Sequence, residues 1–175
     1  MVASSLSEYH GTDQGRAIAY NKHNSHVAVS NNMGEVTIRT KDSLDTVLKS
    51  LKDQKEWSEV IKYSPCGKYL AVGSHDNFIY IYDVSQDYSL LAKFDKHNSF
   101  ITAFDWSADS TYIKSICGAY EKLYYNVSKK EFDNNGMQNT KGFLWASNSI
   151  KKGWDVEGTR PLSEDGTHIN SVDVS

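Results

Sequence analysis

Cysteine, proline and long apolar runs are all scarce in this sequence of 175 residues, which has two cysteines and two prolines. Cys66 and Cys117 stand far apart and form no paired-cysteine motif. The first seven residues contain neither Lys nor Arg, so we expect no secretory signal and reduced thiols. No run approaches the roughly 20 apolar residues that span a bilayer. With 19 Lys and Arg against 22 Asp and Glu, we expect neither nucleic acid nor a membrane as partner.

Aromatic residues are abundant by contrast. Eleven Tyr, six Phe and four Trp make up 12% of the chain. Tyr, Phe and Trp favour pleated sheet, whereas helical domains rely more on Leu and Ala. The length suits a single domain with its own core. The composition therefore predicts one all-β domain.

A repeat with a period of 43 residues organises the sequence. Tyr20, Tyr63 and Trp106 mark three copies, and an aliphatic residue follows each marker seven positions later. Each copy reads as strand, turn, strand, turn and strand, with a fourth strand expected at residues 46–48, 90–94 and 143–145. Residues 128–142 are expected to form a loop. Four short strands in about 40–45 residues are typical of a β-propeller blade.

The number of copies predicts an incomplete propeller over residues 1–175. Blades are expected near 15–56, 57–99 and 100–147, followed by a connecting segment at 148–168 and the first strand of a next blade at 169–175. Closed propellers have about 4–8 blades, so three form an open arc with loose terminal strands. The two end sheets should expose apolar faces, which predicts either a longer parent protein or self-association of the open edges.

Several stretches resemble a known family. Gly-Ser-His-Asp-Asn-Phe-Ile-Tyr-Ile-Tyr-Asp at residues 73–83 is similar to the second and third strands of a WD repeat. Together with the Tyr-Ser-Pro-Cys-Gly turn at 63–67 and Gly-Trp-Asp-Val-Glu-Gly at 153–158, it resembles the echinoderm microtubule-associated-protein-like family. The resemblance is clearest over residues 57–175, and residues 1–56 resemble WD repeats in general.

The resemblance implies a non-catalytic scaffold that binds proteins. It also implies tubulin or microtubules as partners of a longer parent protein, and a cytoplasmic, cytoskeletal location. WD repeats contain a hydrogen-bonded Asp–His–Ser/Thr–Trp chain, which we expect to be incomplete here. His97 has Ala119 and Tyr120 in the turn of its own repeat, and the repeat that carries Asp76 begins with Gln54 instead of His.

Two other functions are compatible with the sequence. The first is hydrolysis by Asp105 and Asp173, which occupy equivalent innermost strands, because glycosidases need two carboxyl groups about 5–9.5 Å apart. The second is a general adaptor without a cytoskeletal role. His23 and His26 lie in or beside one turn, but no Cys or third His joins them at zinc-ligand spacing, so we expect no metal and no cofactor.

The remaining candidate is a protein-binding rim. Loops that lead into the innermost strands share one edge of a propeller with the turns between the second and third strands. The sequence places seven candidate residues there: Trp57, His75, Asp76, His97, Asn98, Phe100 and Tyr120. Aromatic residues often dominate interfaces, although Trp57 and Phe100 are also suited to packing between blades.

Overall fold

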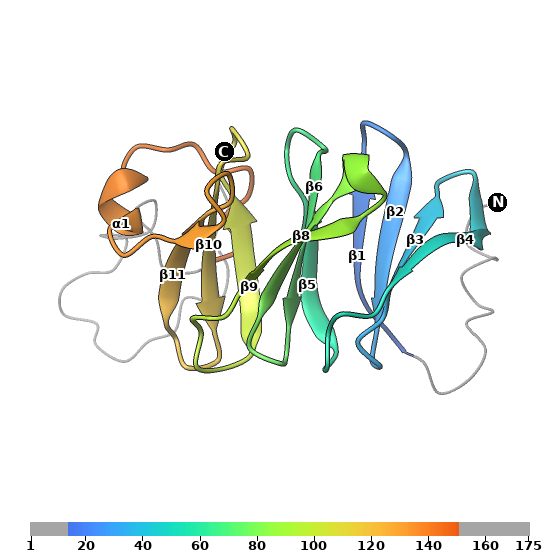
Figure 1. Ribbon diagram of the computed structural model, residues 1–175, viewed down its shortest axis with the longest axis horizontal. Coiled ribbons are helices and arrows are strands. Elements are labelled where there is room, and N and C mark those ends of the chain that lie inside the picture. The colour runs from blue at the N-terminus through green and yellow to red at the C-terminus, as the bar shows by residue number, and fades with distance from the viewer. Residues whose placement is uncertain (1–13, 151–175) are drawn as a thin grey trace, which may run out of the picture.

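The computed structural model describes residues 14–150, and within them the chain forms twelve strands, one short helix and one 3-10 turn. The strands make three four-stranded antiparallel sheets that stand side by side (Figure 1). The first sheet consists of β1 (Gly15–Asn21), β2 (His26–Asn31), β3 (Val36–Thr40) and β4 (Ser43–Leu51). The second consists of β5 (Ser58–Tyr63), β6 (Tyr69–Ser74), β7 (Ile79–Asp83) and β8 (Ser89–Phe94). The third consists of β9 (Ile101–Trp106), β10 (Tyr112–Cys117), β11 (Lys122–Asn126) and β12 (Glu131–Phe132).

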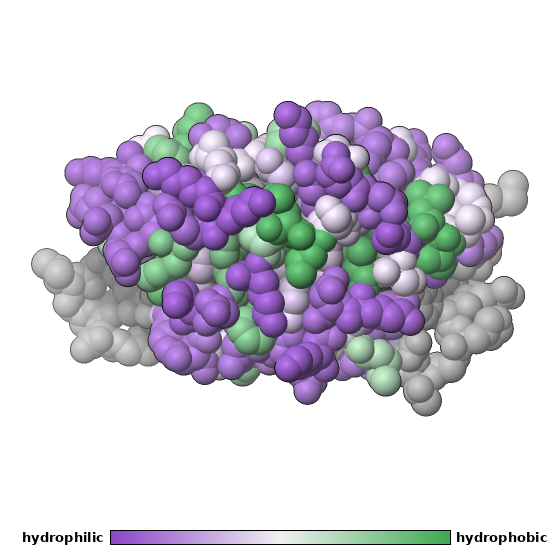
Figure 2. All heavy atoms as spheres, viewed as in Figure 1, coloured by the Kyte–Doolittle hydropathy of each residue, from purple (hydrophilic) through white to green (hydrophobic). Residues whose placement is uncertain are grey.

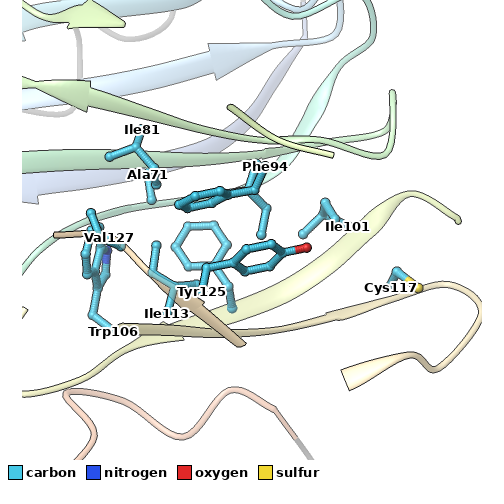
Figure 3. Close-up of a cluster of buried hydrophobic side chains, with 11 residues drawn as sticks. Ala71, Ile81, Phe94, Ile101, Trp106, Ile113, Cys117, Tyr125 and Val127 are labelled. Carbon is cyan, nitrogen blue, oxygen red and sulfur yellow. The ribbon is translucent and has the colours of Figure 1, made fainter. Parts of the chain in front are cut away.

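Two apolar layers hold the sheets together. One cluster lies between the first and second sheets and the other between the second and third. In the latter, the rings of Phe94 and Tyr125 lie against each other (Figure 3), and their centroids are 4.4 Å apart. Each sheet therefore buries its apolar residues against a neighbour rather than against a helix, as a propeller requires.

The exposed fractions of the three marker residues show that the arc is open. Trp106 faces the second sheet and is 1% exposed, and Tyr63 packs against the first sheet. Tyr20 holds the same position on the first sheet but is 50% exposed, and its neighbour Ile18 is 63% exposed. The apolar face is thus repeated in all three sheets, but the first has no described sheet to pack against. The expected all-β, open partial propeller is confirmed.

The fourth strand of the third sheet is not where the sequence placed it. It is β12, inside the segment expected to be a loop, and it is followed by helix α1 (Gly136–Asn139). Residues 143–145 form only an isolated bridge, Trp145 with Ser107, at the end of β9. Two of the large apolar residues at 143–145 contact the third sheet: the Phe143 ring lies 5.7 Å from the Tyr112 ring, and the Trp145 ring lies 4.4 Å from the Lys114 ammonium.

The two end faces of the arc therefore differ. The far face of the third sheet carries Asp105, Lys114 and Tyr124, which are all buried. The chain covers them with α1, which lies at that end of the arc in Figure 1, and with residues 145–150. The expectation of two apolar open faces is wrong for this end, because its face is polar and has its own cover.

Most of the face seen in Figure 2 is hydrophilic, and its hydrophobic residues form separate small patches. No helix within residues 14–150 is both long and apolar enough to cross a membrane.

Candidate protein-interaction rim

One edge of the arc is built by the same hydrogen bond in every sheet. The backbone N–H groups of Asn32, His75 and Gly118 each donate to the carbonyl of a residue that precedes the innermost strand, at 3.0, 2.9 and 2.9 Å. The acceptors are Gln14, Trp57 and Phe100. Donors and acceptors both repeat every 43 residues, so the period of the sequence brings these loops and turns to one edge. We call this edge the interaction rim.

An aromatic stack runs along the interaction rim. The His75 ring lies between Trp57, at a centroid distance of 3.4 Å, and Phe100, at 4.4 Å. On the other side of Trp57, the Arg16 guanidinium lies 4.4 Å from the ring centroid. The stack therefore joins residues of all three sheets, and stacked rings and cation–π contacts hold such side chains in fixed positions.

Exposure within the stack varies. Phe100 is 38% exposed, whereas Trp57 and His75 are half-buried. A Cβ at Gly118 would approach the Phe100 ring to 2.6 Å, so the backbone of the third sheet supports that ring closely. Phe100 both packs between sheets and presents an apolar surface, which combines the two roles considered for it.

Asp76 serves its own sheet. Its carboxylate accepts hydrogen bonds from the backbone N–H of Lys55 at 2.9 Å and from the hydroxyl of Tyr80 at 2.7 Å. These bonds tie the β6–β7 turn to the loop before β5. Asp76 thus positions the interaction rim. At the position where a WD repeat begins with His, this repeat has Gln54, which donates a hydrogen bond to the Tyr82 hydroxyl at 2.6 Å.

His97 is buried beneath the interaction rim. Its Nε2 lies 2.7 Å from the Ser115 hydroxyl, and its Nδ1 lies 3.8 Å from the Glu121 carboxylate. Burial lowers the pKa of His97 to about 4, against the opposing effect of Glu121. The ring is therefore neutral at physiological pH. The turn at Ala119 and Tyr120 lacks the polar groups of a WD-repeat hydrogen-bonded chain. Ser115 and Glu121 take over part of that chain around His97.

Asn98 and Tyr120 flank this group at the surface. Asn98 holds the Glu121 carboxylate from both its backbone N–H, at 3.0 Å, and its side-chain amide, at 2.7 Å. These hydrogen bonds lower the pKa of Glu121 below its usual value. Tyr120 is 69% exposed and has a φ of 62°, so the β10–β11 turn presents its ring to solvent.

Asp105 lies in a polar network away from the interaction rim. It is completely buried, and its carboxylate pairs with the Lys62 ammonium at 2.9 Å. It also accepts hydrogen bonds from Ser149 and from the backbone N–H of Ile150. Burial by itself would raise the pKa of Asp105, but Lys62 and the serine hydroxyls outweigh it and lower the pKa. A carboxylate so enclosed has no approach for a glycoside, which argues against hydrolysis, and Asp173 lies outside the described residues.

Several residues of these networks were missed by the sequence analysis. Arg16, Ser115 and Glu121 carry no motif of their own, and they act through neighbours 18 to 41 positions away. The equivalence of Lys62 and Asp105, which stand 43 residues apart on adjacent innermost strands, was the one available signal for their pairing.

Comparison with known proteins finds a matching protein family. The model of the second β-propeller of echinoderm microtubule-associated proteins matches residues 3–175. This match extends the resemblance seen over residues 57–175 to nearly the whole chain.

Individual relatives agree with this match. The chain is 52% identical over 175 residues to the ciliary WD repeat-containing protein ctxp80 of Euplotoides octocarinatus, covering 99% of this chain and 24% of that protein. It is 42% identical over 124 residues to the 77 kDa echinoderm microtubule-associated protein of Lytechinus variegatus, covering 69% and 18%. It is 38% identical over 149 residues to human echinoderm microtubule-associated protein-like 3, covering 83% and 16%. The chain thus spans about a quarter or less of each relative.

A solved structure shows the same fold. A chain in the crystal structure of the mitotic checkpoint complex superimposes with a TM-score of 0.63 over 69% of this chain and 36% of that chain. The sequence identity is 16%, so the likeness concerns the fold alone.

Proposed function

Because this chain belongs to the echinoderm microtubule-associated protein family, we propose that it is a non-catalytic platform whose interaction rim binds a protein partner. The observation that carries the proposal is the stack of Arg16, Trp57, His75 and Phe100, which spans all three sheets at one edge. Rigid aromatic and arginine side chains with an exposed apolar surface are the residues that most often dominate binding energy. Tyr120 extends this surface on the third sheet.

The partner we propose is the microtubule, bound by a longer parent protein in the cytoplasm. The names of the relatives from Lytechinus variegatus and human support this partner, since both describe microtubule-associated proteins. The ciliary relative is compatible with the same setting. The near balance of basic and acidic residues favours a contact through aromatic side chains over one through a basic patch.

Co-sedimentation of the parent protein with microtubules tests the proposal. The wild type should pellet well above an unrelated propeller. The double substitution Phe100→Ser and Tyr120→Asn should weaken binding about tenfold or more, equivalent to about 1.4 kcal/mol, because it removes two exposed rings. Asn is chosen at Tyr120 because it tolerates positive φ.

A matched control uses the opposite rim. Leu144 is 79% exposed and bonds through its carbonyl to Ala108 in the turn between β9 and β10, so Leu144→Ser removes comparable apolar surface away from the interaction rim. This variant should pellet like the wild type. Absence of pelleting by the wild type would overturn the microtubule partner and favour the general adaptor. Equal pelleting by all three proteins would place the contact elsewhere.

We further propose self-association through the open face of the first sheet. Ile18 and Tyr20 expose an apolar surface there. Completing a ring from two arcs would require this face to pack on the far face of the third sheet, which residues 145–150 cover. The arrangement that remains is a symmetric contact between two first sheets.

A further inference from the structure

Three potential metal ligands converge just beneath the interaction rim of the third sheet. The Nδ1 atom of His97, the Sγ atom of Cys117 and a carboxylate oxygen of Glu121 all lie within 4.8 Å of one another. The Glu121 Oε2 atom is 3.8 Å from Nδ1 and 3.6 Å from Sγ. Cys117 stands at the edge of the apolar cluster (Figure 3), so its thiol can face this polar group.

The three side chains come from different elements. His97 lies in the loop before β9, Cys117 ends β10 and Glu121 lies in the β10–β11 turn. The His97 side chain is 0% exposed and Cys117 is 2% exposed, whereas the Glu121 side chain is 33% exposed. The group is therefore buried on one side and reaches solvent through Glu121, which gives an ion a path of entry.

Hydrogen bonds fix the orientation of the histidine ring. The Ser115 hydroxyl lies 3.4 Å from the carbonyl of Leu123, to which it donates, and 2.7 Å from His97 Nε2. We assign the hydroxyl proton to the Leu123 carbonyl, so that the hydroxyl accepts from Nε2–H and the Nδ1 lone pair is free. Metal-binding histidines are held in this way by a second hydrogen bond from the other ring nitrogen.

The freed Nδ1 atom has no hydrogen-bond partner although it is buried. It points toward a carboxylate oxygen, which is also an acceptor, at a distance too long for a hydrogen bond. Buried polar atoms are nearly always satisfied, so an orphan of this kind calls for an explanation. A cation placed between the two acceptors would satisfy both.

Glu121 is also held in place. Asn98 donates to Oε1 from its side-chain amide and to Oε2 from its backbone N–H. These bonds keep the carboxylate near His97 and Cys117, so little conformational freedom is lost when an ion binds. A positioned carboxylate of this kind reduces the entropy cost of binding.

We propose that His97, Cys117 and Glu121 bind one divalent transition-metal ion, for which Zn²⁺ fits best. Zn²⁺ takes imidazole nitrogen, thiolate sulfur and carboxylate oxygen at about 2.0–2.3 Å, so tetrahedral ligands lie about 3.3–3.8 Å apart. The two separations to the Glu121 oxygen, 3.8 and 3.6 Å, fall in this range, and the third lies within 4.8 Å. Binding releases the thiol proton of Cys117 to solvent, and the thiolate and carboxylate then balance the charge of the ion. Three protein ligands leave the fourth position to water.

Such an ion would join three elements of one sheet edge. It links the loop before β9 to both ends of the β10–β11 connection, where the hydrogen-bonded chain of a WD repeat is incomplete. The sequence alone did not reveal it, because His97, Cys117 and Glu121 are separated by 20 and 4 residues and match no zinc motif. This inference does not depend on the proposed function.

Titration of the 175-residue chain with Co²⁺, a spectroscopic substitute for Zn²⁺, tests the proposal. One equivalent should produce a thiolate-to-cobalt charge-transfer band, and Zn²⁺ should abolish it by displacement. Cys117→Ser should lose the band. Cys66→Ser should retain it, because Cys66 is the only other cysteine and lies exposed in the turn between β5 and β6.

A second variant distinguishes loss of the metal site from loss of folding. Glu121→Gln changes a partly exposed side chain, and we expect it to fold and to bind Co²⁺ about tenfold or more weakly. Zn²⁺ should raise the unfolding temperature of the wild type and of Cys66→Ser. No charge-transfer band with excess Co²⁺, a band that survives Cys117→Ser, or unchanged affinity in Glu121→Gln would each overturn the metal site.

Discussion

Asp105 illustrates how one residue can be charged and fully buried. It lies on the far face of the third sheet, where Lys62 and residues 147–150 satisfy its oxygens. A buried ion pair is stable only when its desolvation is offset by such contacts, and removing one partner leaves the other uncompensated. The network also anchors the segment that covers this sheet face.

Asp105→Asn should therefore destabilise the chain by on the order of 3 kcal/mol, because it breaks a buried ion pair. Urea denaturation followed by circular dichroism measures this loss. Asp87→Asn provides a control, since Asp87 pairs with Lys49 at 2.6 Å but its side chain is 81% exposed. Exposed pairs contribute about 1 kcal/mol or less, so a comparable loss in both variants would contradict the role assigned to Asp105.

The contribution of Asp105 to the unfolding free energy should also depend on pH. The pKa of Asp105 is lowered in the folded chain relative to its ordinary value of 3.8. Its ionised form therefore stabilises the fold above pH 3.8, and this contribution disappears as the pH falls through the folded pKa. The difference in unfolding free energy between wild type and Asp105→Asn should stay constant above about pH 4 and shrink as the pH falls below 3.8. A difference that does not shrink below pH 3.8 would argue against an ionised, paired Asp105.

At the scale of the element, helix α1 and the segment after it act as a cover for the third sheet. Gly136 begins α1 directly against Tyr124 of β11, and a Cβ at this position would overlap the Tyr124 side chain. Trp145 and Asn148 then reach the Lys114 ammonium. A helix of four residues has little stability of its own, so it persists because of this packing.

Gly136→Ala should consequently destabilise the chain by about 1–3 kcal/mol through overpacking. The gain in helix propensity, at most about 1 kcal/mol, is too small to offset the clash. Gly15→Ala is the matched control, because nothing lies within 4 Å of its Cβ position, and it should change stability by less than about 0.5 kcal/mol. Thermal unfolding of both variants measures the contrast. Equal stability would mean that α1 does not pack on Tyr124.

At the scale of the whole molecule, the arc has one covered end and one open end. The far face of the third sheet has its own cover, whereas Ile18 and Tyr20 leave an apolar face on the first sheet. Exposed apolar patches at a sheet face favour association. We therefore assign the proposed self-association to β1 rather than to both ends of the arc.

Light scattering should detect this association as a mass that rises above 19.7 kDa with concentration. The double substitution Ile18→Lys and Tyr20→Lys should return the mass to that of the monomer, because it places charges on the shared face. Leu144→Lys, at the covered end, should leave the association unchanged. A wild type that remains at 19.7 kDa at every concentration would exclude the symmetric contact.

The sequence by itself determined the sheets and the interaction rim. Strand positions follow from alternation and turn chemistry, which are local, and the 43-residue period forces equivalent residues to equivalent places. Trp57, His75 and Phe100 could therefore be assigned to one edge before their rings were seen to stack. The strand expected at 143–145 does not form, because Phe143 and Trp145 contact side chains of β10 whereas Leu144 is exposed, and these contacts depend on the folded sheet.

Only the tertiary structure decided what lies between the repeats. Lys62 finds Asp105, and His97 meets Cys117 and Glu121, through distances that depend on how adjacent strands and turns are placed. These contacts break the repeat, since equivalent positions in other sheets carry different residues. The 43-residue period relates Lys62 to Asp105 but gives no signal for the group of His97, Cys117 and Glu121. The third sheet could cover its own face for the same reason: burial depends on which surfaces meet, and that is settled only when the chain has folded.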